Sequence, residues 1–204
     1  MAGMLKRFFT NCAHPHGMMG RVVLSLMNFG HAPLTNWGLG LIPFRDGWTI
    51  LDVGCGGGKT LRRLLGKSGG AVVHGIDISD ESVAKARKVN SDLLGTRVFV
   101  QKGSAAELPY ADGMFDLVTA VETVYFWPTL PHCLQGVKRV LKHGGLFAIL
   151  IEVTEQDSIW TRVVEGMTPY SPEQLKELLE QAGFVDVQIH RRKPAYAAIV
   201  GMRP

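Results

Sequence analysis

Cysteine is scarce in this chain of 204 residues: it has three, widely separated and in no C-x-x-C pair. Such isolated cysteines do not form a disulfide framework, and they predict a reducing compartment. No stretch approaches the roughly 20 apolar residues that a membrane-spanning helix needs. The apolar run at residues 22–29 is too short for a signal sequence and is broken by Ser25 and Asn28. We therefore expect a cytoplasmic protein with no membrane span.

Blocks of one charge, internal repeats and low-complexity segments are absent as well. The net charge is +4, with basic residues scattered along the chain, so a basic nucleic-acid face is disfavoured but not excluded. A content of 46% hydrophobic and 20% charged residues is typical of one globular domain with a single core. Cys12, His14 and His16 could ligate a metal, but no fourth ligand stands in register. We predict no metal site.

A strand followed by glycines stands out in residues 48–60, WTILDVGCGGGKT. The apolar and β-branched residues of the segment 49–53, interrupted only by Asp52, predict a buried parallel strand. Glycines at positions 54, 56, 57 and 58 end this strand and let a ligand approach the backbone closely. Helical spacing follows in residues 59–65. A strand, a glycine turn and a helix in this order form an opening for a nucleotide or a related cofactor.

Two common glycine motifs do not fit this turn. A phosphate-binding P-loop needs a glycine where Val53 stands, and the dinucleotide motif G-x-G-x-x-G needs its third glycine where Lys59 stands. The pattern present is D-x-G-x-G-x-G, from Asp52 to Gly58. It resembles the first motif of the class I S-adenosylmethionine-dependent methyltransferases. Because that cofactor carries no phosphate, its site needs close backbone approach and an acidic residue, not a lysine.

Two later segments extend the resemblance. Asp77 ends the strand expected at residues 71–78, about where dinucleotide folds place the carboxylate that accepts both ribose hydroxyls. The segment GSAAELPY at 103–110 resembles the family's G-D-A-x-x-L-P-F, with Ser104 in place of the acid that pairs with the adenine amino group. A hydroxyl still accepts one hydrogen bond. The resemblance implies that S-adenosyl-L-methionine is bound by Asp52, Gly54, Cys55, Gly56, Gly58, Asp77, Ile78, Ser104, Ala105 and Glu122.

Strands and helices alternate through the rest of the chain. Further strands are expected at residues 97–101, 115–121 and 146–151, and a helix before the last of these is expected to end at Gly144 and Gly145. Residues 184–190 and 195–201 predict a closing antiparallel pair. This order predicts an α/β, doubly wound sheet. The resemblance, which covers residues 48–201, implies the Rossmann-like class I fold of seven strands, the last one antiparallel.

The first 46 residues do not read as part of the sheet. Helical spacing predicts one helix at residues 17–29 and another at 33–42. These helices either cover one edge of the domain or close over the cofactor as a lid. We therefore divide the chain into an N-terminal helical cap or lid, residues 1–46, and an S-adenosylmethionine-binding domain, residues 47–204.

The segments 103–110 and 170–184 resemble the small-molecule branch related to ubiquinone and menaquinone biosynthesis. This implies methyl transfer to a small-molecule acceptor by in-line displacement, with S-adenosyl-L-homocysteine as the product. After the fourth strand, VETV stands where nucleic-acid amino methyltransferases have D/N-P-P-Y/F, which disfavours methylation of adenine or cytosine amino groups. An RNA or protein methyltransferase, or a non-catalytic S-adenosylmethionine-binding protein, remains the alternative.

Histidine and aromatic side chains near the expected strand ends are candidates for the acceptor site. Positioning and desolvation can drive transfer from a sulfonium, so a base is not obligatory. If a base acts, we rank His31 ahead of Glu152, and we expect Trp160 in the core. The candidates for substrate binding are His31, Trp37, Tyr125, Trp127 and Tyr170.

Overall fold

The computed structural model describes residues 30–153, 166–192 and 195–204. The helix expected at residues 17–29, the candidate metal ligands Cys12, His14 and His16, and Trp160 lie outside these ranges. None of the helices within them has the length and apolar character that crossing a bilayer demands.

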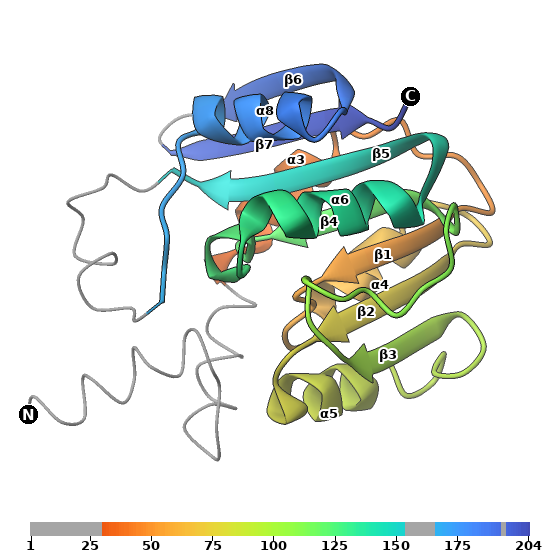
Figure 1. Ribbon diagram of the computed structural model, residues 1–204. Coiled ribbons are helices and arrows are strands. Elements are labelled where there is room, and N and C mark those ends of the chain that lie inside the picture. Colours follow the sequence, from red (N-terminus) through yellow and green to blue (C-terminus); the bar gives the residue numbers. More distant parts are fainter. Residues whose placement is uncertain (1–29, 154–165, 193–194) are drawn as a thin grey trace, which may run out of the picture.

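The described residues form a seven-stranded sheet in the order β3-β2-β1-β4-β5-β7-β6 (Figure 1). Strands β1 to β5 pair in parallel, whereas β7 runs antiparallel to both β5 and β6. This arrangement confirms the α/β class and the antiparallel last strand expected from the sequence. The strands are β1 (Thr49–Val53), β2 (Val72–Asp77), β3 (Val98–Lys102), β4 (Phe115–Val121), β5 (Leu141–Glu152), β6 (Val185–Arg192) and β7 (Tyr196–Met202).

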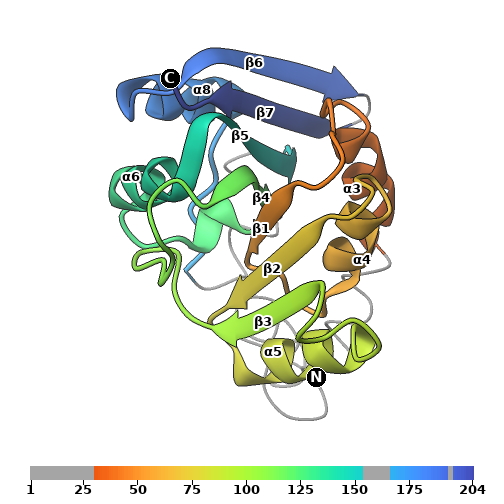
Figure 2. The same ribbon diagram turned by 90° about the vertical axis from the view of Figure 1, so that its right-hand side faces the viewer.

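Helices cover both faces of the sheet, as the two views together show (Figure 2). Helices α3, α4 and α5 share one apolar cluster with one face, and α6 and α8 pack with the other. Burial on both faces of the sheet explains why β1, β4 and residues 146–151 of β5 are mostly apolar. The helices are α3 (Ala32–Leu39), α4 (Lys59–Leu65), α5 (Asp80–Val89), α6 (Leu130–Val140) and α8 (Pro172–Gln181), with a short 3-10 helix η1 (Val124–Phe126).

The start of β5 differs from the sequence prediction. The helix before it ends at Val140, not at the glycine pair, and the strand begins at Leu141. Leu141 pairs with Phe115 and Leu146 pairs with Leu117, so the ladder is irregular between them. Gly145 allows this detour, because a Cβ there would lie 2.8 Å from the Lys142 carbonyl oxygen. Contrary to the sequence prediction, Gly144 and Gly145 therefore do not end the helix but lie in the irregular first part of β5.

Helix α3 lies in the described part of the N-terminal segment, residues 30–46, and it corresponds to the helix expected at residues 33–42. Its residues Leu34 and Leu39 are buried in the same cluster as Ile50 of β1. Gly38 lies directly against the Leu150 side chain of β5, where any larger residue would clash. The packing holds the start of α3, with His31 as its N-cap residue, near the carboxyl ends of β4 and β5.

The N-terminus of α8 offers a local test of the fold. Ser171 Oγ accepts from the Gln174 backbone N–H at 3.1 Å, and Gln174 Oε1 accepts from the Ser171 N–H at 2.8 Å, which is a complete capping box. Ser171→Ala should lower the free energy of unfolding by about 1 kcal/mol in a urea titration. Ser171→Asp keeps a side-chain acceptor and should lose less. Equal losses in the two variants would contradict a capping role.

Candidate functional site

The glycine turn after β1 lies against the ends of two neighbouring strands. The backbone N–H groups of Gly54 and Cys55 both donate to the Ile76 carbonyl of β2, at 2.8 and 3.0 Å. Gly54 has φ +79°, and a Cβ on it would lie 2.5 Å from Thr123 Cγ2 beyond β4. The turn therefore requires glycine at position 54, both for its left-handed backbone and for the close approach to Thr123.

The Asp77 carboxylate lies beside this turn at the end of β2. Its Oδ2 accepts from the Gly56 N–H at 2.8 Å, and its Oδ1 accepts from the Ser79 N–H at 2.9 Å. The Gly103 N–H donates to the Asp77 carbonyl at 3.0 Å, which places the segment that contains Ser104 next to it. The structure thus gathers the glycine turn, Asp77 and Ser104 at one edge of the sheet, as the sequence predicts.

Asp52 lies beneath the turn, with a relative exposure of 1%. Its Oδ1 accepts from Thr119 Oγ1 of β4 at 2.7 Å. Burial raises the pKa of Asp52 to about 7; the Thr119 hydrogen bond opposes this shift, and the Asp77 charge adds to it. The side chain therefore links β1 to β4, and its predicted contact with the cofactor stays a prediction.

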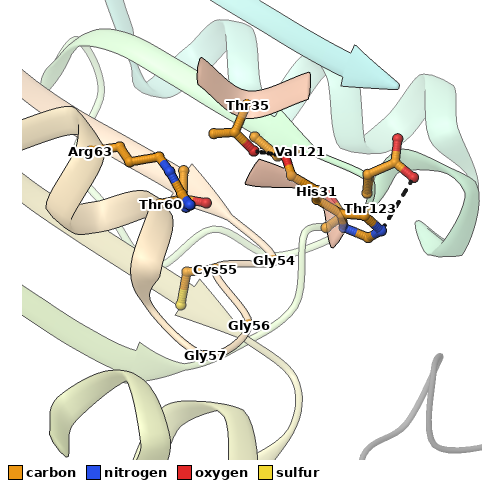
Figure 3. A pocket seen from close by; sticks show the side chains of 11 residues that line it. His31, Thr35, Gly54, Cys55, Gly56, Gly57, Thr60, Arg63, Val121 and Thr123 are labelled. Carbon is orange, nitrogen blue, oxygen red and sulfur yellow. Dashed lines mark hydrogen bonds and ion pairs between the residues drawn. The ribbon is translucent and has the colours of Figure 1, made fainter. Parts of the chain in front are cut away.

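A cavity opens beside the glycine turn, between α3, α4 and the end of β4 (Figure 3). Its empty space is about 480 Å³, which includes the part that is open to solvent. Main chain from the turn forms one wall, and side chains from the helices and from the end of β4 form the others. The residues that line it are His31, Thr35, Gly54, Cys55, Gly56, Gly57, Thr60, Arg63, Val121, Glu122 and Thr123.

Glu122 stands at the end of β4 in an unusual backbone conformation, with φ +57°. Its Oε1 accepts from the Glu152 backbone N–H, and its Oε2 lies 4.0 Å from His31 Nε2 (Figure 3). The buried Tyr125 hydroxyl lies beside this carboxylate, although it makes no hydrogen bond of good geometry with any described residue. Four residues thus come together here: His31 before α3, Glu122 after β4, Tyr125 of η1 and Glu152 of β5.

Burial sets the charge state of this cluster. It raises the pKa of Glu122 to about 7; the Tyr125 hydroxyl and the Glu152 N–H oppose the shift, and the Glu152 charge adds to it. Burial also lowers the pKa of His31 and, together with the Glu122 charge, raises that of Tyr125. The Glu122 carboxyl therefore gains and loses its proton near neutral pH, beside a histidine that tends to be uncharged.

Sequence reasoning missed Arg63, Thr60 and Thr35 at the cavity. Arg63 is partly buried, burial lowers its pKa, and it makes no ion pair with a described residue. Arg63 and Thr60 stand three positions apart on α4, so they share one face of that helix. Continuing the helical spacing from the glycine turn could have indicated both. Thr35 donates to the His31 carbonyl at 2.7 Å and stabilises the start of α3.

Several predicted residues do not line this cavity. Gly58 is the N-cap of α4, and a Cβ there would lie 2.6 Å from Ala86 Cα, so it allows α4 and α5 to pack closely. Trp37 packs against Tyr196, and Trp127 stacks on Phe147 in the core. The other predicted residues outside the cavity lining are Asp52, Asp77, Ile78, Ser104, Ala105, Tyr125, Glu152 and Tyr170. Their predicted roles stay predictions.

Comparison with known proteins agrees with this geometry. A family model described as a methyltransferase domain matches residues 51–149. The chain is 35% identical over 174 residues to an uncharacterised methyltransferase of Synechocystis sp., and the match covers 79% of this chain and 76% of that relative. The chain belongs to the class I S-adenosylmethionine-dependent methyltransferases. The cofactor of this family is the one that the glycine turn and Asp77 predict.

This methyltransferase domain is also 36% identical over 118 residues to 27-O-demethylrifamycin SV methyltransferase of Amycolatopsis mediterranei, covering 57% of this chain and 43% of that relative. The chain spans about half the length of the first two curated relatives that it matches, 43% and 52%. Among solved structures, an S-adenosylmethionine-dependent methyltransferase from Aquifex aeolicus matches with a TM-score of 0.65 and 26% identity, over 78% of this chain and 84% of that one.

The site of this methyltransferase suits its family's cofactor chemically. Gly54 and Gly56 present main chain without side chains to the cavity, and the Asp77 carboxylate can accept hydrogen bonds from a sugar. Arg63 offers a positive charge to a carboxylate. Within the described ranges, no group of three or more His, Cys, Asp or Glu side chains is placed to hold a metal ion.

Proposed function

We propose that this protein transfers a methyl group from S-adenosylmethionine to a small-molecule acceptor. The observation that carries the proposal is the glycine turn, whose Gly56 N–H is held by Asp77 beside a cavity with one cationic and one acidic wall. When bound, S-adenosylmethionine supplies an electrophilic methyl group on a sulfonium. The protein then has to hold, orient and desolvate the two reactants.

Three groups of residues hold the cofactor in this proposal. Asp77 accepts from the ribose hydroxyls, and Ile78 and Ser104 lie on the adenine side. Gly54, Cys55 and Gly56 offer their backbone to the amino-acid portion, with the main chain of Glu122 on the opposite wall. Arg63, with Thr60, binds the methionyl carboxylate, because it is the cationic side chain from the described residues that lines the cavity.

The acceptor binds on the side of His31, Glu122 and Tyr125. Tyr170 packs against the same apolar cluster as Tyr125, and the Thr168 N–H donates to the Tyr125 carbonyl at 2.9 Å, so the segment before α8 borders this side. His31 and Tyr170 lie outside the 51–149 range that matches the family. The relative named 27-O-demethylrifamycin SV methyltransferase supports a small-molecule acceptor here too.

The alternatives make different predictions. An RNA methyltransferase would bind RNA with an affinity that falls steeply as salt rises. A non-catalytic binding protein would bind S-adenosylmethionine without ever converting it to S-adenosylhomocysteine. Calorimetric titration with both cofactor forms tests the binding site itself. Failure to bind either form would overturn the proposal.

Arg63→Ala should weaken S-adenosylhomocysteine binding by about tenfold or more, because a partly buried, charge-assisted contact to the carboxylate is lost. 5′-Methylthioadenosine has the same nucleoside and a thioether but no amino-acid portion. Its affinity should therefore be the same in the parent and in Arg63→Ala. Calorimetry with the two ligands measures both effects.

Arg62 provides the matched control for this prediction. It is the adjacent residue of α4, and its guanidinium pairs with Asp92 on the surface instead of lining the cavity. Arg62→Ala should leave both affinities within about twofold of the parent. If Arg62→Ala and Arg63→Ala weaken S-adenosylhomocysteine equally, the effect is one of helix stability or overall charge, and the carboxylate assignment is wrong.

A further inference from the structure

Glu122 is fixed at the end of β4 more firmly than a contact between its own main chain and the cofactor would require. A non-glycine residue at φ +57° carries a strain that persists only where the surroundings impose it. Here β5 imposes it: the Glu122 N–H donates to the Leu150 carbonyl at 2.9 Å, and the Glu152 N–H donates to Glu122 Oε1. These contacts hold one carboxylate oxygen and leave Oε2 toward the cavity side, where His31 lies.

The surroundings of this carboxylate come from four elements. His31 of α3 lies 4.0 Å from Oε2, the Tyr125 hydroxyl of η1 is buried beside it, and Glu152 of β5 adds a second acidic charge. No lysine or arginine of the described ranges forms an ion pair with it. The Glu122 side chain is 12% exposed and that of His31 is 29% exposed, so His31 is the more accessible of the two to solvent.

Such a group has the properties of a general base. It titrates near neutral pH, where a base combines its ionised form with enough basicity to accept a proton. A structural ion pair would instead face a permanent cation. The buried Tyr125 hydroxyl can donate to an acceptor atom or to the carboxylate itself.

We propose that Glu122 is the general base of the reaction, and that the acceptor is a molecule whose nucleophilic atom carries a proton, a hydroxyl or an amine. The inference rests on the proposed function. The X–H bond of the acceptor breaks and its proton goes to the Glu122 carboxylate. The freed electron pair on X forms the bond to the methyl carbon, and the electron pair of the broken C–S bond stays on sulfur, which becomes a neutral thioether. The proton leaves past His31 to solvent.

A cofactor analogue tests this without knowledge of the acceptor. Sinefungin carries an amine where S-adenosylmethionine carries its sulfonium methyl group, so its ammonium reports on a carboxylate at the point of transfer. The parent should bind sinefungin about tenfold to a hundredfold more tightly than S-adenosylhomocysteine at pH 8. This preference should shrink as the pH falls through about 7, because Glu122 then becomes protonated.

Glu122→Gln should remove the preference and its pH dependence while leaving the affinity for S-adenosylhomocysteine within about threefold of the parent. Glu152→Gln is the matched control: it removes the neighbouring acidic charge and should keep the preference. Far-ultraviolet circular dichroism and thermal melts check that both variants fold.

The outcomes separate the two proposals. If the parent does not bind S-adenosylhomocysteine, the proposed function fails. If it binds, but Glu122→Gln weakens S-adenosylhomocysteine and sinefungin equally, Glu122 contacts the shared amino-acid portion and is not the base. The inference is also overturned if the parent shows no preference for sinefungin. The same holds if Glu152→Gln loses the preference while Glu122→Gln keeps it.

Discussion

Replacing Asp77 by alanine should weaken the binding of S-adenosylmethionine, S-adenosylhomocysteine and 5′-methylthioadenosine alike, by about a hundredfold or more. Each hydrogen bond to a charged partner contributes about 1.5–3 kcal/mol, and the carboxylate is expected to accept two from the ribose. All three ligands contain this ribose. Calorimetry should therefore show the same loss for all of them, in contrast to Arg63→Ala, which spares the ligand without an amino-acid portion.

Asp77 also shapes the site before any ligand is considered. Its two oxygens accept from the Gly56 and Ser79 N–H groups, so alanine also removes one anchor of the glycine turn and one at the start of α5. Asp77→Asn keeps the size of the side chain and one carbonyl acceptor, and it should lose less affinity than alanine.

Asp80 supplies the control for charge. It lies three residues on, exposed, and pairs with Lys102 at 2.6 Å. Asp80→Asn should bind all three ligands like the parent. An Asp77→Ala protein that still binds S-adenosylhomocysteine with parental affinity would show that the ribose is held elsewhere.

Local patterns predicted most of the strands well, whereas the predicted cofactor contacts stay predictions. Strand β4 and helix α4 have the bounds that apolar runs and helical spacing indicate, because short-range preference and tertiary burial favour the same residues there. The predicted start of β5 is wrong because a glycine pair is equally compatible with the end of a helix and with an irregular strand. Position in the sheet decides between these, and it depends on pairing with Phe115 of β4, far away in sequence.

The acceptor side could be predicted only in outline. The sequence predicts His31 as a candidate base. In the structure it lies beside Glu122, which is 91 positions away in sequence, and no local pattern predicts this contact. Glu122 itself was predicted only as a cofactor contact, since its left-handed backbone and the Glu152 N–H on its side chain arise from the β4–β5 pairing. Side-chain burial, which moves its pKa, is equally non-local.

Gly54→Ala should lower the free energy of unfolding by about 2–4 kcal/mol and abolish measurable cofactor binding. The alanine at position 54 must adopt φ +79°, a backbone conformation that costs about 1 kcal/mol or more. Its Cβ would also lie 2.5 Å from Thr123 Cγ2 and 2.8 Å from Thr123 Cβ. Separation of the turn from Thr123 would relieve this clash. It would also disturb the hydrogen bond from Thr123 Oγ1 to the Val53 carbonyl, 3.0 Å long, and move the cavity wall that we propose for cofactor binding.

Gly47→Ala separates the two contributions to this loss. Gly47 has φ +77°, nearly the same backbone conformation, but a Cβ there would meet nothing within 4 Å. This variant should lose only the backbone contribution, about 1 kcal/mol in a urea titration, and bind S-adenosylhomocysteine like the parent. If both variants lose the same stability and both still bind, the contact between Gly54 and Thr123 does not shape the site. A selective loss of binding in Gly54→Ala would instead locate the cofactor against this main chain, because the two substitutions differ in what the added methyl group meets.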